Sequence, residues 1–399
     1  MTAVQPAQPI ELTEYVPRLL AATEMAADLG NLLWRNYEQQ VEVEFPNPKT
    51  GHQWRLMSKG WAGHIPLTLE FQLALRPKVQ LANLFQMLEY AYNLKSFRFL
   101  PGLIDCHSLA DYYEQLASIL AKRVLDRARQ GFYRAYLAES DQLPYLRGRM
   151  DLRQSMGRPG QIKLQCDYEE HTADIDDNQI LAWTLQQIAR HDICSDRVLP
   201  AVRRAYRTLH GLVTPTPHGP EACLGRLYHR LNEDYRPLHA LCRFFLEQSG
   251  PSHHLGDRKM LPFLVDMARL YERFVAEWLK ANLPAGLDLK VQERVDVSDS
   301  ANVHFNIDLV LSKSSTGMAR WVLDTKYKRA GGPEAADIHQ MISYAHTKGC
   351  PEAILIYPEP LNRPFDETIR GIRVRSLTFS LNGDLEQAGR QFLQELEQA

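Results

Sequence analysis

The sequence predicts an α+β multidomain protein, in which an N-terminal region of mixed strands and helices precedes a C-terminal α/β domain. Three observations support this prediction. An alternating strand pattern near the N-terminus changes to a helical one, the middle of the chain carries long helical stripes, and the C-terminal third alternates β-prone segments with helices. The length of 399 residues also exceeds that of most single domains.

The N-terminal region, residues 1–95, is predicted to be rich in strands. Residues 67–75 read LTLEFQLAL, with apolar side chains at every second position, which is the period of a half-buried strand. After Pro77, the segment VQLANLFQMLEYAYNL carries apolar residues three and four positions apart, so a helix is expected to follow the strand.

The middle region, residues 96–250, is predicted to be mainly helical. A helical stripe runs from about Ser108 to Leu137, and further helices are expected at 178–190 (capped by Asp176 or Asp177), 196–212 and 223–248. Near residues 144–170, Gly and Pro separate short β-prone segments, which predicts hairpins. Their basic side chains either contact phosphate or an acidic partner surface, or are simply solvated; they are Arg147, Arg149, Arg153, Arg158 and Lys163.

The C-terminal region, residues 251–399, begins after Gly250 and Pro251, which we take as a domain boundary. Residues 261–283 form an amphipathic pattern that predicts a helix, with Glu272 at the margin of its apolar stripe. Three β-prone segments follow, LDLKVQERVDV, ANVHFNIDLVLS and ARWVLDTKYKR. The second and third flank KSSTG and should form a hairpin.

The stretch VLDTKYKR, residues 322–329, places Asp324 and Lys326 two positions apart, so a strand would direct both to the same face. Taken by itself this is an ordinary solvent-facing ion pair. The predicted hairpin, however, also brings Asp308 close to Asp324, among apolar neighbours where unpaired carboxylates are costly. Mg²⁺ would neutralise them, because it prefers hard oxygen ligands, and Lys326 could orient an attacking water.

The next segment, residues 331–349, predicts a helix on which Asp337, Gln340 and Tyr344 share one face. By themselves Gln340 and Tyr344 are consistent with an ordinary polar helix face. PEAILIYP then predicts another buried strand.

Composition excludes several classes of protein. A formal net charge of -2 argues against a generally cationic nucleic-acid coat, so any contact with DNA must be local or shared with a partner. The six cysteines are scattered without metal-ligand spacing, which is typical of reduced structural thiols. There is no GxxxxGK[ST] phosphate loop. No signal-peptide pattern or long apolar run is present, so we expect a cytoplasmic protein that does not contact a membrane.

The order of a helix with an acid, a hairpin with Asp and then Asp-x-Lys, a helix and a further strand resembles the PD-(D/E)xK nuclease core, in its subgroup with a QxxxY helix. The resemblance implies that Asp308 and Asp324 are metal ligands, that Lys326 is the catalytic lysine and that Glu272 is the upstream acid and a further ligand. Gln340 and Tyr344 would line the site. Mg²⁺ would be the cofactor, with Mn²⁺ able to substitute. Ile307 stands where the motif usually has proline.

Most of the chain also resembles the McrC family, the nuclease subunits of McrBC-type modification-dependent restriction systems. The resemblance rests on residues 61–94 (WAGHIPLTLEFQLALRPKVQLANLFQMLEYAYNL) together with LRGRMDLRQSM, CDYEEHTADIDDNQIL and LDTKYKR. It implies a Mg²⁺-dependent endonuclease for modified double-stranded DNA. It also implies a hexameric AAA+ GTPase partner of the McrB type, which the N-terminal region would bind and stimulate. The hairpin around Arg147 to Arg158 and the segment Lys59 to His64 are candidate partner contacts.

Two alternatives remain open. The chain could act chiefly as an assembly and GTPase-stimulating module, with a nuclease site that is secondary or directed at RNA. It could also be a repair nuclease of the RecB or Cas4 type, whose members often carry a cysteine-ligated iron-sulfur cluster. The dispersed cysteines, of which only Cys350 lies near the nuclease motif, argue against that cluster.

Overall fold

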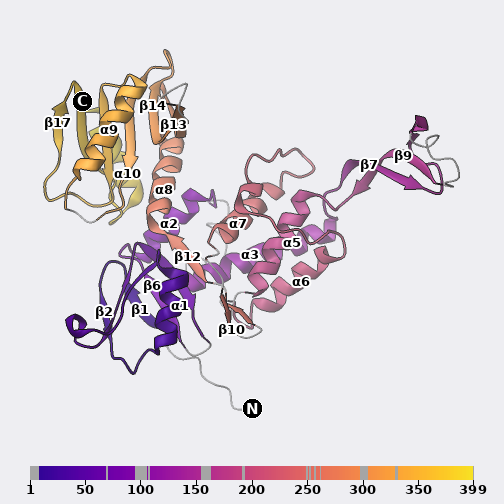
Figure 1. Cartoon of the computed structure of the whole chain (residues 1–399). Coiled ribbons are helices and arrows are strands. Elements are labelled where there is room, and N and C mark those ends of the chain that lie inside the picture. Colours follow the sequence, from indigo (N-terminus) through magenta and orange to yellow (C-terminus); the bar gives the residue numbers. More distant parts are fainter. Residues whose placement is uncertain are drawn as a thin grey trace. The chain divides into compact units, whose positions relative to one another are not determined.

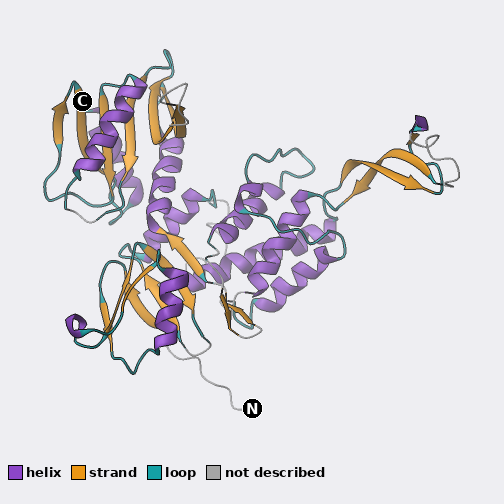
Figure 2. Ribbon diagram, viewed as in Figure 1, coloured by secondary structure: helices purple, strands orange, loops and turns teal. Residues whose placement is uncertain are grey.

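The structure is a computed structural model, and it combines helices with several β-sheets in an α+β multidomain fold (Figures 1 and 2). It describes residues 9–68, 71–94, 106, 108–153, 163–190, 194–248, 250, 253–255, 258–260, 262–296, 304–328 and 331–398. The chain divides into two compact units, one formed by Met1–Leu109 with Gly250–Ala399 and the other by Ala110–Ser249. The predicted division into three regions stays a prediction. No helix in the described ranges is long and apolar enough to cross a membrane.

The N-terminal part of the first unit contains two small sheets. One has the order β1–β6–β5–β12, formed by Ile10–Thr13, Gln72–Arg76, Trp61–Pro66 and Phe263–Asp266. The other has the order β2–β4–β3, formed by Arg18–Leu20, Trp54–Ser58 and Val41–Glu44. Helix α1 (Ala27–Tyr37) packs beside β3, and a short 3-10 turn spans Pro48–Thr50. Leu33, Trp54, Leu73 and Leu264 are among the buried side chains of their shared core.

Strand β12 was not expected from the sequence, which predicted a helix from residue 261. Its residues pair antiparallel with β5, Phe263 opposite His64 and Asp266 opposite Trp61. Asp266 then caps helix α8 (Met267–Asn282), because its carboxylate accepts hydrogen bonds from the amides of Ala268 (3.0 Å) and Arg269 (3.1 Å). The N-terminal sheet therefore fixes the point at which α8 begins.

The predicted strand at residues 67–75 is also shorter than expected. Leu67 and Thr68 lie in a turn, in which both amides donate to the carbonyl of Phe71, and the strand β6 covers only Gln72–Arg76. The helix predicted after Pro77 is present as α2 (Leu81–Ala91).

A six-stranded sheet dominates the C-terminal part, with the order β13–β14–β15–β16–β18–β17. Its strands are Leu287–Asp296, His304–Lys313, Ala319–Thr325, Glu352–Tyr357, Ile372–Thr378 and Asp366–Ile369. Strands β14 and β15 form the predicted hairpin, and β15, β16 and β18 run parallel. Helix α9 (Ala335–Lys348) connects β15 to β16, as a crossover between parallel strands requires.

Helices cover both faces of this sheet around β16. Every residue of β16 is buried, which requires cover on both sides because successive strand residues point to opposite faces. Ala353 and Leu355 pack with Met341 and Ala345 of α9. Away from that cluster, Phe379 contacts the rings of Phe274 and Trp278 on α8 and stacks on Phe392 of α10 (Leu385–Glu397). Strands β10 (His253–Leu255) and β11 (Arg258–Met260) form a separate pair.

The second unit is mainly helical. Its long helices in the described ranges are α3 (Leu109–Gln130), α5 (Asp176–Arg190), α6 (Leu199–His210) and α7 (Tyr235–Glu247), with a 3-10 turn at Pro220–Cys223. Two predicted helices are much shorter than expected. Helix α3 ends before Gly131, whose φ of 91° is left-handed, and residues 224–234 precede α7 without being helical. Asp176 and Asp177 lie inside the first turn of α5 rather than before it.

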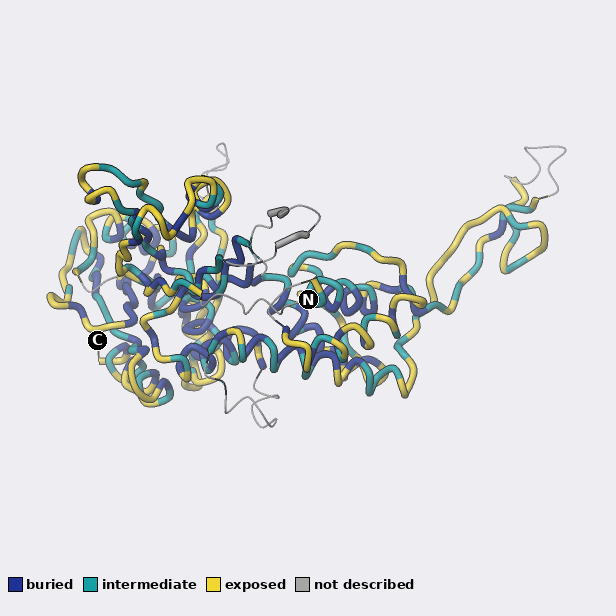
Figure 3. The backbone as a smooth tube through the Cα atoms, turned by 90° about the horizontal axis from the view of Figure 1, so that it is seen from below, coloured by how far each residue is buried: buried dark blue, intermediate teal, exposed yellow. Residues whose placement is uncertain are grey.

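Strands β7 (Ala135–Leu143), β8 (Arg149–Met150) and β9 (Leu164–Thr172) form an antiparallel arm that extends from these helices (Figures 1 and 2). The strand β7 is exposed along almost its whole length (Figure 3). Part of the predicted basic hairpin, including Arg158, lies outside the described residues. Several large apolar side chains on the arm face solvent; they are Tyr136, Leu137, Tyr145, Leu146 and Leu152.

Candidate active site

The predicted acidic residues of the hairpin meet where the end of β15 lies beside the middle of β14. Leu309 pairs with Leu323, and the same register one step further places Asp308 opposite Asp324. The Asp308 carboxylate accepts long hydrogen bonds from the Thr325 amide (3.3 Å) and hydroxyl (3.5 Å). The structure therefore brings together the two carboxylates that the sequence predicted to be neighbours.

Burial and mutual repulsion raise the pKa of both carboxyl groups. Desolvation raises the pKa of Asp324 to about 6, and the nearby charge of Asp308 adds to this shift. Desolvation likewise raises the pKa of Asp308 to about 6, with a further contribution from the charge of Glu272. A nearby cation would relieve both costs.

Lys326 supplies one such positive charge. Its ammonium nitrogen Nζ lies 2.7 Å from Asp324 Oδ2 and 3.4 Å from Asp337 Oδ1. Burial alone would lower the pKa of Lys326, but its hydrogen bond and attraction to Asp324, with the charge of Asp337, raise the pKa above its usual value. The ammonium is thus held in its charged form beside the two acids.

Helix α9 orients Lys326 through the two residues predicted from its sequence. Lys326 Nζ donates to Gln340 Oε1 at 3.2 Å, and Gln340 Nε2 donates to the Tyr344 hydroxyl at 2.6 Å. Tyr344 is 6% exposed and packs edge-on against the ring of Phe305. The chain of contacts Tyr344, Gln340, Lys326, Asp324 restricts the lysine to one side of the site.

Glu272 on α8 also belongs to this electrostatic group. Burial raises its pKa, and the charge of Asp324 raises it further, although a hydrogen bond from Gln292 opposes this. Gln292 Nε2 donates to Glu272 Oε1 and, at 3.4 Å, to Asp308 Oδ1. All six residues predicted for the site are therefore linked to one another by contacts or by charge.

Sequence reasoning missed Gln292 and assigned no role to Asp337. Asp337 was placed on the same helix face as Gln340, and it lies beside both Lys326 and Lys328. The two lysines lower the pKa of Asp337 despite its burial. Nothing in the sequence marks Gln292 as a site residue, because a glutamine in an alternating strand is typical of a solvated position.

The residues present could supply a Mg²⁺ ion with a pair of carboxylate ligands. No group of three His, Cys, Asp or Glu side chains in the described part of the chain is arranged to hold a metal ion. Mg²⁺ needs only one or two protein carboxylates, because it keeps several waters. Asp308 and Asp324 supply that pair, and the hydrogen bonds to Asp308 are long enough to be exchanged for a metal contact. A role for Glu272 as third ligand stays a prediction.

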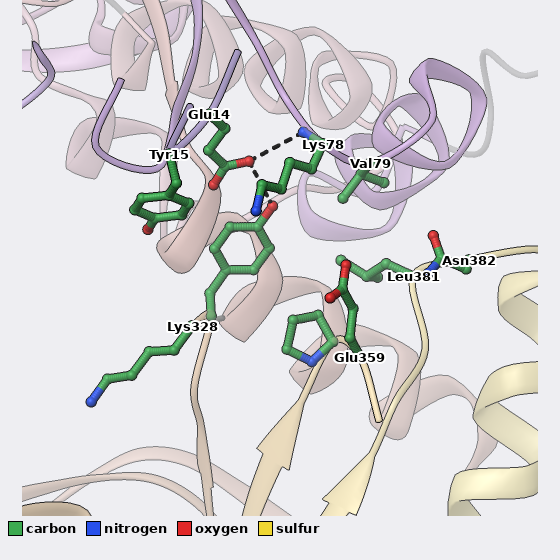
Figure 4. A pocket seen from close by; sticks show the side chains of 10 residues that line it. Glu14, Tyr15, Lys78, Val79, Lys328, Glu359, Leu381 and Asn382 are labelled. Carbon is green, nitrogen blue, oxygen red and sulfur yellow. Dashed lines mark hydrogen bonds between the residues drawn. The ribbon is translucent and has the colours of Figure 1, made fainter. Parts of the chain in front are cut away.

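A pocket lies beside this site, where the chain leaves β15 (Figure 4). Tyr327 follows Lys326 directly, and its hydroxyl donates to Glu14 Oε2 at 3.1 Å, an oxygen that also accepts from the Lys78 amide at 3.2 Å. Glu14 is fully buried, and desolvation raises its pKa. This contact ties the segment after Lys326 to the N-terminal sheet.

Sequence comparisons find relatives among restriction-system proteins. The model of a family described as McrBC 5-methylcytosine restriction system component matches residues 56–358. The type IV methyl-directed restriction enzyme EcoKMcrBC of Escherichia coli (strain K12) is 22% identical over 296 residues, which cover 67% of this chain and 81% of that protein.

A solved structure is similar over nearly the whole chain. It is described as a refined half-complex from a tetradecameric assembly of Thermococcus gammatolerans McrB AAA+ hexamers with bound McrC. The matched chain has a TM-score of 0.56 and 17% identity, and the alignment covers 98% of this chain and 100% of the other. At this identity the likeness establishes the fold.

Proposed function

We propose that this chain, which belongs to the family of McrBC 5-methylcytosine restriction system components and is McrC-like, is the Mg²⁺-dependent endonuclease subunit of its restriction system. The observation that carries the proposal is the Asp308 and Asp324 pair with Lys326 beside it. Two adjacent carboxylates with a lysine beside them are groups that can support metal-assisted phosphodiester hydrolysis.

Each residue has a distinct task in this proposal. Asp308 and Asp324 would hold Mg²⁺, which when bound polarises the phosphate and lowers the pKa of a coordinated water. The Lys326 ammonium would stabilise the negative charge that develops on the phosphate oxygens, because it is charged and next to the metal ligands. Gln340 and Tyr344 keep this ammonium in place.

The substrate we propose is double-stranded DNA that carries modified bases. The printed description of the Escherichia coli relative, a methyl-directed restriction enzyme, supports this choice. The chain itself has a formal net charge of -2, so we assign recognition and movement of the DNA to a partner and cleavage to this chain.

The partner we propose is a hexameric AAA+ GTPase of the McrB type. This chain has no phosphate loop of its own, and the similar solved structure holds McrB AAA+ hexamers with bound McrC. The arm formed by β7, β8 and β9 is the better of the two predicted contact surfaces, since Tyr145 and Leu146 at its turn are 58% and 62% exposed. In the alternative segment, Ala62 and Gly63 are buried inside a sheet between β6 and β12.

Cleavage of a methylated plasmid tests the proposal. The chain is combined with Mg²⁺, GTP and its AAA+ partner, and wild type is compared with Asp324→Ala and Asp288→Ala. Asp288 is an exposed carboxylate on β13, paired with Ser312 at the opposite end of the hairpin, and serves as the matched control. We expect cleavage by wild type and Asp288→Ala and none by Asp324→Ala, with partner binding unchanged in all three.

Two results would contradict the proposal. Cleavage by Asp324→Ala at the wild-type rate would remove the hairpin site from the reaction. Stimulated GTP hydrolysis without cleavage by any variant would instead support the assembly and GTPase-stimulating module, a function that the exposed apolar arm could serve without a nuclease site.

A further inference from the structure

Gln292 occupies an unusual backbone position next to the candidate active site. On strand β13, Val291 pairs with Leu309 and Glu293 pairs with Ile307, so Gln292 lies opposite Asp308. Its φ of 50° is in the left-handed region, which non-glycine residues seldom adopt inside a strand. Such a conformation persists only where the surroundings enforce it, and it is concentrated at functional sites.

The side chain of Gln292 joins two carboxylates that come from different elements. Its Nε2 donates to Glu272 Oε1 on α8 and to Asp308 Oδ1 on β14, the second contact being 3.4 Å. The opposite amide orientation would place Oε1 against two negatively charged groups, so the donating orientation is the one that electrostatics favours. Gln292 is itself exposed, which places it at the solvent side of the site.

We propose that Gln292 is a positioning residue that holds the Glu272 and Asp308 carboxylates together before a divalent cation enters. The inference rests on the proposed function, in which Asp308 and Asp324 hold the cation. Without the amide, these two half-buried carboxylates would repel each other and turn apart. With it, Glu272 stays beside the metal site, and less reorganisation is needed when the cation binds.

Binding of Mn²⁺ to the full chain tests this role without any cleavage. The bound fraction is measured from the loss of the free Mn²⁺ signal in electron paramagnetic resonance, at pH 7.5. Gln292→Ala removes the amide and keeps the backbone strain, whereas Gln292→Gly removes the amide and relieves the strain. Lys290→Ala is the control, an exposed residue two positions earlier on β13.

We expect Gln292→Ala and Gln292→Gly each to weaken Mn²⁺ binding by about tenfold or more, the usual effect of removing a group that orients a metal ligand. Lys290→Ala should bind as wild type does. Wild-type affinity in Gln292→Gly would overturn the inference, because it would show that only the backbone shape matters at this position.

Gln292→Glu gives a second and opposite test. It preserves the length of the side chain but replaces the amide donor with a third carboxylate, so the metal-free protein should unfold at a lower temperature than wild type. Added Mn²⁺ should then raise the midpoint by more than it does for wild type. An unchanged metal-free midpoint would contradict the contact with Glu272 and Asp308.

Failure of the proposed function would look different. In that case the wild-type protein would show no saturable Mn²⁺ binding, or binding that Asp324→Ala does not abolish. Either result would overturn both proposals together. Wild-type binding that Asp324→Ala abolishes and that neither Gln292→Ala nor Gln292→Gly weakens would overturn the positioning role alone.

Discussion

Asp308 and Asp324 face each other across the β14–β15 hairpin, one register step beyond the paired Leu309 and Leu323. Burial first, then the charge of a neighbouring acid, raises the pKa of each carboxyl to about 6. In an unfolded chain an aspartate has a pKa near 3.9. The folded, metal-free protein therefore binds these protons more tightly than the unfolded chain does.

The first prediction concerns stability and pH. Because the folded pKa of Asp308 is raised, the cost of its ionisation to stability is absent below about pH 4, grows between about pH 4 and pH 6, and is fully present above that. We expect Asp308→Asn to stabilise the metal-free protein by on the order of 2 kcal/mol at pH 7.5 and to change its stability little at pH 3.5. Denaturant unfolding with a chelator at both pH values measures this.

Asp366→Asn is the control of opposite sign. Its hydrogen bonds with Arg373 lower the pKa of Asp366, so its contribution to stability is present above the unfolded pKa and lost as pH falls. The variant should be less stable than wild type at pH 7.5. A destabilised Asp308→Asn at pH 7.5 would mean that the two hairpin carboxylates do not repel each other.

The second prediction concerns the path from Tyr344 to Lys326. Tyr344→Phe removes the acceptor of the hydrogen bond from Gln340, which leaves Gln340 free to turn away from Lys326. We expect the cleavage rate of the assembled complex to fall by about ten to a hundredfold and Mn²⁺ affinity to stay unchanged, since Tyr344 contacts neither carboxylate.

Tyr206→Phe provides a matched change in the second unit, where the Tyr206 hydroxyl accepts a hydrogen bond from Gln186 at 3.2 Å. It removes the same kind of contact without touching the site and should leave cleavage unaffected. Equal rates for both variants would show that Gln340 does not depend on Tyr344 for its position.

The third prediction concerns the arm. Replacing Tyr145 and Leu146 together by serine removes exposed apolar surface at the turn and should weaken binding to the AAA+ partner by at least about tenfold, as loss of interface anchors does. Thermal stability should not fall, because neither side chain is buried. Sedimentation of the mixed proteins measures the binding.

The control for the arm is Leu227→Ser, at a leucine of the same unit that is 89% exposed. It tests whether any loss of surface apolarity weakens the complex. Undiminished binding and undiminished GTPase stimulation by the Tyr145 and Leu146 double variant would remove the arm from the interface.

The hairpin could be predicted because its information is local. Strand alternation, the turn at KSSTG and the buried neighbours of Asp308 and Asp324 all lie within about thirty residues, and the spacing of Gln340 and Tyr344 sets one helix face. These local patterns were enough to predict which side chains lie around Lys326.

Features set by distant partners could not be predicted. The segment at 263–266 continues an apolar helical pattern in sequence, yet it is a strand because β5, about two hundred residues earlier, offers it an edge to pair with. The left-handed φ of Gln292 likewise could not be predicted from the alternating sequence around it. The extent of β6 and the ends of α3 and α7 were wrong because periodicity locates the ends of elements poorly.

The fourth prediction tests whether this long-range pairing positions the site. Gly63 on β5 has a φ of 139°, and a Cβ added there would lie 2.0 Å from the carbonyl oxygen of Phe263 on β12. Gly63→Ala must therefore separate β5 from β12, the strand that leads into α8 and Glu272. We expect a loss of about 3 kcal/mol or more in the free energy of unfolding, together with weaker Mn²⁺ binding.

Gly51→Ala is the control, because Gly51 also has a positive φ, 63°, but open space around it. This variant should lose only about 1 kcal/mol in the free energy of unfolding and leave Mn²⁺ affinity unchanged. If Gly63→Ala unfolds more easily yet binds Mn²⁺ as tightly as wild type, the β5–β12 pairing stabilises the fold without positioning the site.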